Sequence, residues 1–295
     1  MADGLIPGVR LYAKLEGMQN VGSFKIRGVA NMVDKAPAEV LSGNRTLISM
    51  SAGNFGRAMA YICQQKNLKG KILMPSTVPK SRIEIIKGCG CDVELQPSAN
   101  LQPAVDNYVK EQNMVYLHPF DDLNLIAGYG SMGMEILEDC PSPDFVVVCC
   151  GGGGLVSGVS AAIKQSGLSP ATKVIAVEPV TANTMYLSLK EGHAVHNGAA
   201  KSIAAGLAPP FVGENTYAHV KKYVDDVVLV TDEEIKESVS ILYKCGLVVE
   251  PSGTAAFTAV RCGKIAGVKG KTVVVVLTGS NVSPEELTQL VNYTS

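Results

Sequence analysis

The sequence predicts an α/β fold of two three-layer lobes with largely parallel sheets, and three observations lead to this prediction. Short apolar runs alternate with amphipathic stretches almost throughout the 295 residues. Several runs are continuous and β-branched, notably 146–148 and 273–276, as is typical of strands buried on both faces of a parallel sheet. Hydrophobic residues make up 46% of the chain and charged residues 18%. This composition excludes disordered, collagen-like and coiled-coil proteins.

Each expected element has its own local signal. Apolar, often β-branched runs predict strands at 9–15, 47–50, 71–74, 92–95, 115–117, 145–150, 174–177, 227–230 and 272–277. Helices are expected between them, including 23–34, 54–66, 155–165 and 232–245. Capping boxes mark two helix starts, Thr231 with Glu234 and Ser283 with Glu286. In the second, Pro284 occupies the first helical position.

The strands also suggest how the chain is divided. From about residue 45 to 121 they form a compact strand–helix series, and longer strands follow from 145. We therefore expect residues 46–121 to form a small lobe, and 1–45 with 122–295 to form a large lobe that binds the ligand. Open α/β sheets place ligands at strand ends, so a site between the lobes is expected.

Charge and cysteine content narrow the class of protein. There are 26 Lys and Arg against 27 Asp and Glu, so no basic surface indicates binding to nucleic acid or an anionic membrane. The start, MADGLIPG, lacks the pattern of a secretory leader. The uncharged stretch 145–163 contains four consecutive glycines, which disfavour a membrane-spanning helix. We expect a soluble cytoplasmic protein whose eight cysteines are reduced thiols, with no metal ligands assigned.

The 30 glycines include a group beside the predicted strands. Four turns rich in glycine or serine occupy residues 22–25, 51–54, 151–154 and 278–281. We call 51–54 the serine turn and 151–154 the glycine loop. In the glycine loop, residues without Cβ allow consecutive N–H groups to surround an anion at a helix start, which predicts a phosphate site. A tight turn below a packed helix would explain only one or two of the glycines.

A dinucleotide is the competing ligand for the glycine loop. Gly152 and Gly154, with Glu178 ending the next strand, match part of the dinucleotide fingerprint, but Ser157 holds the place of its third glycine. Lys25 favours a different cofactor. Its neighbours Phe24 and Ile26 would desolvate the amine and favour its neutral, nucleophilic form, although a solvated helix lysine is the simpler interpretation. A neutral lysine together with a phosphate site is what a pyridoxal phosphate enzyme requires.

The four turns together resemble a known family. Residues 22–28 (GSFKIRG), 51–54 (SAGN), 151–154 (GGGG) and 278–281 (TGSN) are similar to the signatures of serine/threonine dehydratases. These are fold type II pyridoxal phosphate enzymes, of the tryptophan-synthase-β-like group that also includes serine racemase. The motifs occur in family order, so the resemblance covers nearly the whole chain.

The resemblance implies a role for each motif. Lys25 would bind the cofactor and later act as the base at the substrate Cα, Phe24 would pack beside the cofactor ring, and Thr278 would face the pyridine nitrogen. A hydroxyl at that nitrogen makes the ring a weaker electron sink, which favours prompt β-elimination. The remaining implied contacts are Gly151, Gly152, Gly153, Gly154 and the Leu155 N–H to the phosphate, Asn54 to the cofactor 3′-oxygen, and Ser51, Ala52, Gly53 and Asn54 to the substrate.

One residue favours dehydration over racemisation. Ala52 stands where eukaryotic serine racemases have a serine that moves protons, and a methyl group cannot do so. We therefore expect a dehydratase of L-serine or L-threonine, with racemase as the alternative. A nicotinamide-dependent oxidoreductase and a catalytically inactive binding protein are less favoured alternatives. Glu178 and Ala182 match part of the racemase-type divalent-cation site, but Thr184 replaces its aspartate, so no monovalent or divalent cation is assigned.

Other positions depart from the family pattern. Phe55 replaces a common histidine and Tyr129 a common glutamine, while Glu250 occupies the place of a site-proximal glutamate or a helix-start carboxylate. Relatives carry a few tens of residues before the first strand, so a shortened form is one expectation. Only 17 residues follow Thr278 in the sequence, so we expect a catabolic type without the C-terminal regulatory domain of biosynthetic threonine dehydratases. A homodimer is expected from the resemblance alone.

Overall fold

The computed structural model describes residues 5–198 and 200–291. Residues 1–4, part of the segment without a leader pattern, lie outside the described residues. The chain forms two compact units, which we call unit 1 (Met1–Phe24 and Tyr129–Ser295) and unit 2 (Lys25–Gly128). The lobe boundaries expected from the sequence, after residues 45 and 121, stay a prediction.

Unit 1 contains a five-stranded parallel sheet, and each strand confirms one predicted run to within two residues at either end. In spatial order the strands are β1 (Arg10–Leu15), β9 (Thr272–Leu277), β6 (Phe145–Cys149), β7 (Lys173–Pro179) and β8 (Asp226–Val230). All five residues of β6 are buried, as expected for a continuous apolar run in the middle of a parallel sheet.

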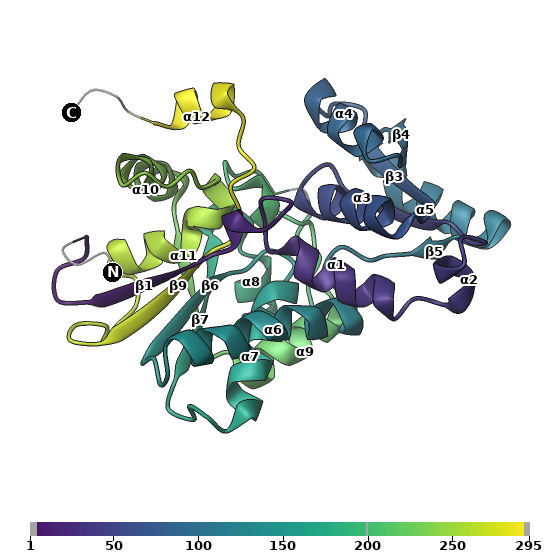
Figure 1. The fold of residues 1–295 in the computed structure, drawn as a ribbon. Coiled ribbons are helices and arrows are strands. Elements are labelled where there is room, and N and C mark those ends of the chain that lie inside the picture. Colours follow the sequence, from purple (N-terminus) through teal and green to yellow (C-terminus); the bar gives the residue numbers. More distant parts are fainter. Residues whose placement is uncertain (1–4, 199, 292–295) are drawn as a thin grey trace. The chain divides into compact units, whose positions relative to one another are not determined.

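Helices cover both faces of this sheet. The helices and short 3₁₀ turns wholly within unit 1 are η1 (Glu16–Met18), α7 (Gly154–Ser166), η3 (Val180–Ala182), α8 (Thr184–Glu191), η4 (Ala205–Leu207), α9 (Glu214–Tyr223), α10 (Asp232–Lys244), α11 (Pro251–Arg261) and α12 (Pro284–Leu290). In Figure 1, α10 and α11 lie on one side of the sheet, and α7 and α9 lie on the other. This arrangement gives the three layers that the sequence predicts. A further helix, α6 (Leu123–Asp139), runs across the boundary between the units.

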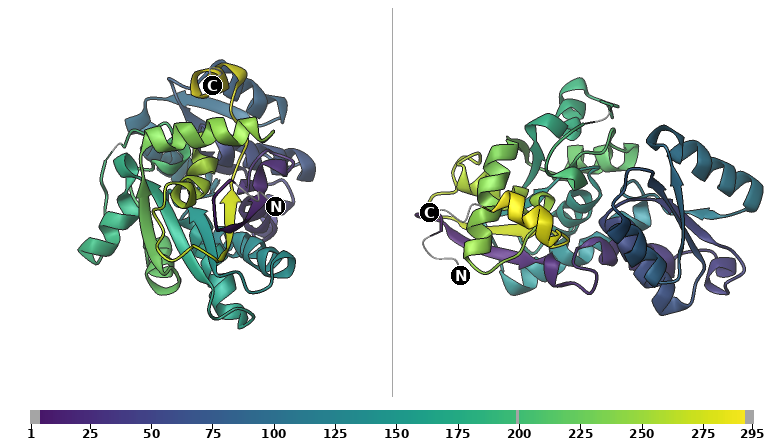
Figure 2. Two further views of the ribbon diagram at one scale, coloured as in Figure 1. Left: turned by 90° about the vertical axis from the view of Figure 1, so that its left-hand side faces the viewer. Right: turned by 90° about the horizontal axis from the view of Figure 1, so that it is seen from above.

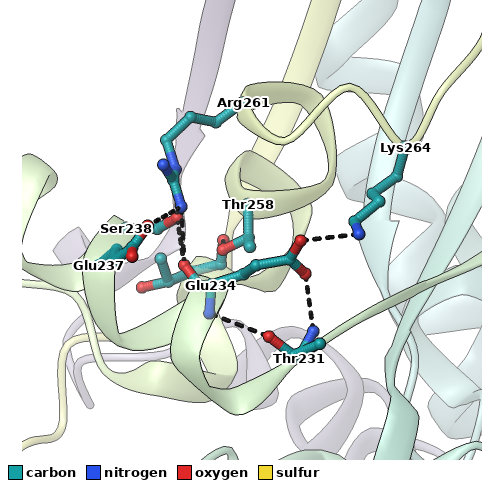
Figure 3. A network of polar contacts seen from close by, with 8 residues as sticks. Thr231, Glu234, Glu237, Ser238, Thr258, Arg261 and Lys264 are labelled. Carbon is teal, nitrogen blue, oxygen red and sulfur yellow. Dashed lines mark hydrogen bonds and ion pairs between the residues drawn. The ribbon is translucent and has the colours of Figure 1, made fainter.

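Polar contacts join α10 to α11 and to the turn that follows α11 (Figure 3). The predicted capping box is present: the Thr231 hydroxyl accepts the Glu234 N–H at 3.2 Å, and the Glu234 carboxylate accepts the Thr231 N–H at 2.8 Å. Lys264 pairs with Glu234 at 2.7 Å, and Arg261 donates to the Ser238 hydroxyl at 2.9 Å. These contacts fix the two helices on one face of the sheet.

The second predicted capping box begins α12. The Ser283 hydroxyl accepts the Glu286 N–H at 3.2 Å, and the Glu286 carboxylate accepts the Ser283 N–H at 2.9 Å. Figure 2 shows α12 beside α10. The Ser240 hydroxyl of α10 donates to the Leu290 carbonyl at 3.1 Å, so the end of α12 is bonded to the rest of unit 1.

Unit 2 contains a four-stranded parallel sheet. In spatial order its strands are β4 (Asp92–Gln96), β3 (Gly70–Pro75), β2 (Leu47–Met50) and β5 (Val115–Tyr116). Its helices are α1 (Lys25–Asp34), α2 (Ala38–Leu41), α3 (Asn54–Lys66), α4 (Lys80–Gly88) and α5 (Leu101–Gln112), with a 3₁₀ turn, η2 (Ser98–Asn100). Val105 of α5 packs on Ile48 and Leu73, so α5 covers one face of this sheet.

In each sheet there is a pair of neighbouring strands from which the chain continues to opposite sides of the sheet. In unit 1 the chain runs from β6 to β7 on one side, while β9 lies on the other side of β6. In unit 2 it runs from β2 to β3 on one side, while β5 lies on the other side of β2. Parallel sheets leave a crevice at the carboxyl ends of such a pair of strands. The segments after β6, β9, β2 and β5 are therefore where ligands are expected.

Among the described residues, no helix is long and apolar enough to cross a membrane. The same part of the chain contains no group of three or more His, Cys, Asp or Glu side chains that could hold a metal ion. All eight cysteines are described, and all are free thiols.

Candidate active site

The glycine loop joins the central strand of unit 1 to α7. Gly153 has a φ of 91°, in the left-handed region, and precedes the first helical residue, Gly154. No side chain caps the start of α7, whereas Thr231 and Ser283 cap the starts of α10 and α12. An uncapped helix start after a turn of this kind presents N–H groups and a positive dipole end, which suit a phosphate group.

Packing inside unit 1 explains two of the four glycines. A Cβ at Gly151 would lie 2.9 Å from the Gly206 carbonyl oxygen of η4. A Cβ at Gly153 would lie 2.7 Å from Met185 Cε of α8 and 2.9 Å from Thr216 Cβ of α9. The loop is therefore held closely against three elements. The tight-turn explanation considered from the sequence accounts for these two positions.

A buried carboxylate holds one of these supporting elements. Glu178, at the end of β7 and 1% exposed, accepts the backbone N–H groups of Met185 at 2.9 Å and Tyr186 at 2.8 Å. Burial raises the pKa of Glu178 to about 8, although the two backbone hydrogen bonds act to lower it. Glu178 therefore fixes the start of α8, from which Met185 reaches Gly153. No local sequence signal indicates this role, because the partners are backbone N–H groups of a helix, seven and eight residues farther along the chain.

Thr278 and Phe24 meet at the neighbouring strand end of unit 1. Thr278 follows β9 and is 2% exposed, and its hydroxyl lies 3.5 Å from the Cys149 thiol at the end of β6. Its carbonyl accepts the Phe24 N–H at 3.0 Å. The Phe24 ring packs against the buried ring of Tyr129, with centroids 5.0 Å apart. The structure thus brings Thr278 and Phe24 together at the carboxyl end of β9.

Glu250 supports the turn that follows Thr278. It precedes α11, as a helix-start carboxylate would, but its side chain makes no capping bond. Instead its carboxylate accepts the Asn281 N–H at 3.0 Å. A Cβ at Gly279 would lie 2.9 Å from Glu250 Oε1. The sequence left two roles open for Glu250, a helix-start carboxylate or a glutamate close to the site. The bond to Asn281 favours the second role.

The serine turn follows β2 in unit 2. The Ser51 N–H donates to the Leu73 carbonyl at 3.1 Å, and the Gly53 N–H donates to the Ser51 hydroxyl at 3.3 Å. Arg82 donates to the Ala52 carbonyl at 3.3 Å. Helix α3 begins at Asn54, as predicted, and no side chain caps its start. The turn therefore has the uncapped helix start that a carboxylate-binding segment needs.

Lys25 is the first residue of α1. Its amine donates to the Pro119 carbonyl at 2.9 Å and lies 5.7 Å from the centroid of the Phe55 ring in α3. The aromatic group beside the amine is thus Phe55, whereas the sequence directed attention to the adjacent Phe24 and Ile26. Lys25, Phe55 and the serine turn all belong to unit 2.

Sequence reasoning missed the segment that holds the Lys25 amine. Residues 118–121, which we call the histidine turn, follow β5 and carry Pro119. His118 Nδ1 accepts the Asp121 N–H at 2.8 Å and the Phe120 N–H at 3.3 Å. The available signal was a His-Pro pair directly after a predicted strand, although only the fold shows that this strand lies beside β2.

Comparisons with known proteins agree with this geometry. The family model described as pyridoxal-phosphate dependent enzyme matches residues 4–279. The L-threonine ammonia-lyase of Thermotoga maritima is 35% identical over 97% of this chain and 71% of its own length. The catabolic L-threonine dehydratase of Escherichia coli is 31% identical over 96% of this chain and 86% of its own. The chain spans 47% and 49% of the biosynthetic threonine dehydratases of Solanum lycopersicum and Arabidopsis thaliana.

Solved structures give the same result. Processed threonine deaminase isoform 2 of Solanum lycopersicum has a TM-score of 0.90 at 34% identity, covering 96% of this chain and 82% of that chain. Maize serine racemase has a TM-score of 0.88 at 29% identity, covering 96% and 86%. These similarities confirm the predicted α/β fold with two parallel sheets.

Proposed function

The chain belongs to the family of pyridoxal-phosphate dependent enzymes, and we propose that within it the protein is an ammonia-lyase that dehydrates L-threonine or L-serine. Similarity to threonine ammonia-lyases and dehydratases over nearly the full chain supports this reaction class. The observation that carries the choice of reaction is Ala52 in the serine turn. Its methyl group offers no second acid or base for racemisation.

The residues of both units fit the cofactor. In unit 1, the glycine loop presents the uncapped start of α7 to a phosphate, and Thr278 places a hydroxyl at the next strand end. In unit 2, the Lys25 amine is held by a carbonyl at the start of α1. Pyridoxal phosphate would be attached to Lys25 in the resting protein, and once the substrate amine has replaced Lys25 on it, it would withdraw electrons from the substrate Cα and leave the Lys25 amine free. We infer that Gly151, Gly152, Gly153, Gly154 and Leu155 hold the phosphate, and that Asn54 holds the 3′-oxygen.

The chain's own residues would then perform a β-elimination. The Lys25 amine takes the proton from Cα, and the electron pair of that bond forms a Cα–Cβ double bond as the C–O bond to the β-hydroxyl breaks. The departing hydroxide takes up one proton, so the proton lost from Cα and the hydroxyl lost from Cβ together account for one water. The serine turn, with Ser51, Ala52, Gly53 and Asn54, binds the substrate carboxylate and so fixes the Cα–H bond for Lys25. The enamine product hydrolyses in water to a 2-oxo acid and ammonia.

A direct experiment tests this function. The purified protein with pyridoxal phosphate should absorb visible light, and borohydride should fix the cofactor to the peptide that contains Lys25, as mass spectrometry would show. L-Threonine or L-serine should then yield a 2-oxo acid and ammonia in equal amounts. The Lys25→Ala protein, treated identically, is the control and should take no covalent label. Protein that binds no pyridoxal phosphate, or binds it without forming 2-oxo acid from either substrate, would contradict the proposal.

Racemisation is the second candidate, because serine racemases are among the structural relatives. We expect Ala52→Ser to raise the rate of L-serine racemisation, since the new hydroxyl supplies the missing proton carrier. Chiral chromatography of the remaining serine measures this rate. Fast racemisation by the unchanged protein would show that Ala52 is not the deciding residue.

We also propose a homodimer in solution, which rests on the family resemblance alone. Light scattering coupled to size-exclusion chromatography measures the mass directly. A species of 31.0 kDa, the mass of one chain, would contradict the dimer.

A further inference from the structure

The histidine turn lies at the crevice of the unit 2 sheet. It follows β5, and the serine turn follows β2, the neighbouring strand. The Leu117 N–H donates to the Ile48 carbonyl at 2.9 Å, and the Ser49 hydroxyl donates to the Leu117 carbonyl at 2.7 Å. The strand before His118 is thus bonded to β2, so the position of the histidine turn is fixed from one side by the sheet.

The His118 ring fixes the turn from the other side. Its Nδ1 accepts the N–H groups of Asp121 at 2.8 Å and Phe120 at 3.3 Å. The ring edges meet Tyr116 and Phe120, with centroids 5.7 Å and 4.6 Å away. An Nδ1 that accepts two hydrogen bonds carries no proton, so the ring is neutral with its proton on Nε2.

This geometry holds the Lys25 amine through one intervening carbonyl. Pro119 lies between His118 and the two N–H groups that His118 accepts, and its carbonyl takes the hydrogen bond from Lys25 Nζ at 2.9 Å. Proline restricts its own φ, and the two bonds to Nδ1 restrict the residues that follow. The direction of the Pro119 carbonyl is therefore set by the neutral imidazole.

We propose that His118 is a positioning residue for Lys25: its neutral ring orders the histidine turn and so aims the Pro119 carbonyl that holds the Lys25 amine. This inference rests on the proposed function of Lys25 as the base at Cα. It adds that the proton-transfer geometry depends on a side chain that does not itself touch the reacting atoms.

The surroundings of His118 set the pH at which this arrangement fails. Burial lowers the pKa of His118 below its ordinary value of 6.5, and the charge of Lys25 lowers it further, while Asp121 and Asp122 act to raise it. Because the folded-state pKa is depressed, the neutral ring is fully present above pH 6.5. The arrangement is lost as the pH falls through the lowered pKa. A protonated Nδ1 cannot accept the two N–H groups, so acid should release the turn and reduce turnover.

Two substitutions in the holoenzyme separate the acceptor from the charge. His118→Leu removes the acceptor, and we expect kcat to fall roughly tenfold, the effect of losing two hydrogen bonds, with KM nearly unchanged. His118→Asn keeps an acceptor, because an asparagine side chain can accept N–H groups two and three residues ahead, and it does not titrate. We therefore expect His118→Asn to restore kcat to within about threefold of wild type and to remove the loss of activity below pH 6.5. His193→Asn, which changes an exposed histidine, should alter neither.

NMR tests the same proposal without measuring turnover. The chain has four histidines, so ¹⁵N-histidine labelling with a His118→Asn reference identifies the His118 signals. We expect the Nε2-protonated neutral tautomer at pH 7.5 and protonation only below pH 6.5. A proton on Nδ1, or titration at or above 6.5, would overturn the proposal.

The kinetic results can also overturn it. Equal kcat values for His118→Leu and wild type would exclude a positioning role. If circular dichroism shows that both variants are folded, equal losses of kcat in His118→Leu and His118→Asn would show that turnover does not depend on an acceptor for the two N–H groups. A wild-type protein without lyase activity would contradict the proposed function, and the NMR tautomer would then still decide whether His118 orders the turn.

Discussion

The helix start after the interior strand differs between the two units. In both units an uncapped helix start follows an interior strand, α7 after β6 and α3 after β2. Gly153, just before α7, has a φ of 91° and a crowded Cβ position. Gly53, just before α3, has a φ of −132°, and an added Cβ there would meet no heavy atom within 4 Å. Glycine is therefore required at position 153 by the backbone conformation and the close packing, whereas at position 53 it leaves open space in front of the helix start.

The difference extends to the groups around each turn. In unit 1 the atoms around the glycine loop support its shape. Glu178 holds the backbone of Met185, and the side chains of Met185 and Thr216 lie beside Gly153. In unit 2 the helix that follows the serine turn places the Phe55 ring 5.7 Å from the Lys25 amine, and the strand beside β2 leads into the histidine turn that holds this amine. In the proposed function, unit 1 therefore holds the phosphate and unit 2 supplies the base at Cα. Changes in unit 1 should alter cofactor binding, and changes in unit 2 should alter turnover or substrate binding.

The largest expected effect is in unit 2. Lys25→Ala should reduce 2-oxo acid formation by at least roughly 10³-fold, because both covalent attachment and the base are lost. Noncovalent cofactor binding through unit 1 should survive, and equilibrium dialysis with pyridoxal phosphate measures it. Complete loss of cofactor binding in Lys25→Ala would contradict the division of roles between the units.

The sequence sufficed for the strands and for much of the chemistry. All nine strands and both capping boxes are present as predicted, because β-branched runs and Thr231 or Ser283 three residues before a glutamate act locally. Asn54 also begins a helix, as expected, and α1 begins at Lys25, two residues after the predicted start at 23. These signals depend on residues close together in the chain, and a single sequence contains them.

The surroundings of the Lys25 amine could not be predicted from the sequence, because they depend on contacts between distant segments. The bond from Lys25 to Pro119 joins residues 94 positions apart and exists only because β5 pairs with β2. The aromatic neighbour of the amine is Phe55 because α1, which begins at Lys25, packs against α3. Strand order is set by packing of the whole unit, so adjacent residues such as Phe24 and Ile26 were the only neighbours that could be considered from the sequence.

The next effect tests unit 1. Gly153→Ala should lower the affinity for pyridoxal phosphate by roughly 30-fold or more, because the left-handed φ costs about 1–2 kcal/mol and overpacking about 1–3 kcal/mol more. Met185 Cε lies at the end of a flexible side chain and can move aside. Thr216 Cβ cannot move as easily, because the Thr216 hydroxyl donates to the Gly213 carbonyl at 3.0 Å. Fluorescence titration with the cofactor measures the affinity.

A matched control separates the two causes. Gly192 has a φ of 82° but open space at its Cβ position, so Gly192→Ala carries the backbone strain without the clash. It should lower the melting temperature slightly and leave cofactor affinity unchanged. Equal losses of cofactor affinity in both variants would show that backbone strain, and not the close packing of the glycine loop, limits binding.

The smallest effect should come from the matching change in unit 2. Gly53→Ala adds a methyl group where φ is negative and no described atom is near, so neither the melting temperature nor cofactor affinity should change. The methyl group would instead enter the space that we assign to the substrate carboxylate. KM for L-threonine should rise by up to roughly tenfold, the effect of one methyl group in a binding site. Steady-state kinetics with thermal unfolding measures both quantities. A loss of stability or of cofactor affinity like that of Gly153→Ala would mean that the two helix starts have the same role, and an unchanged KM would place the substrate carboxylate away from Gly53.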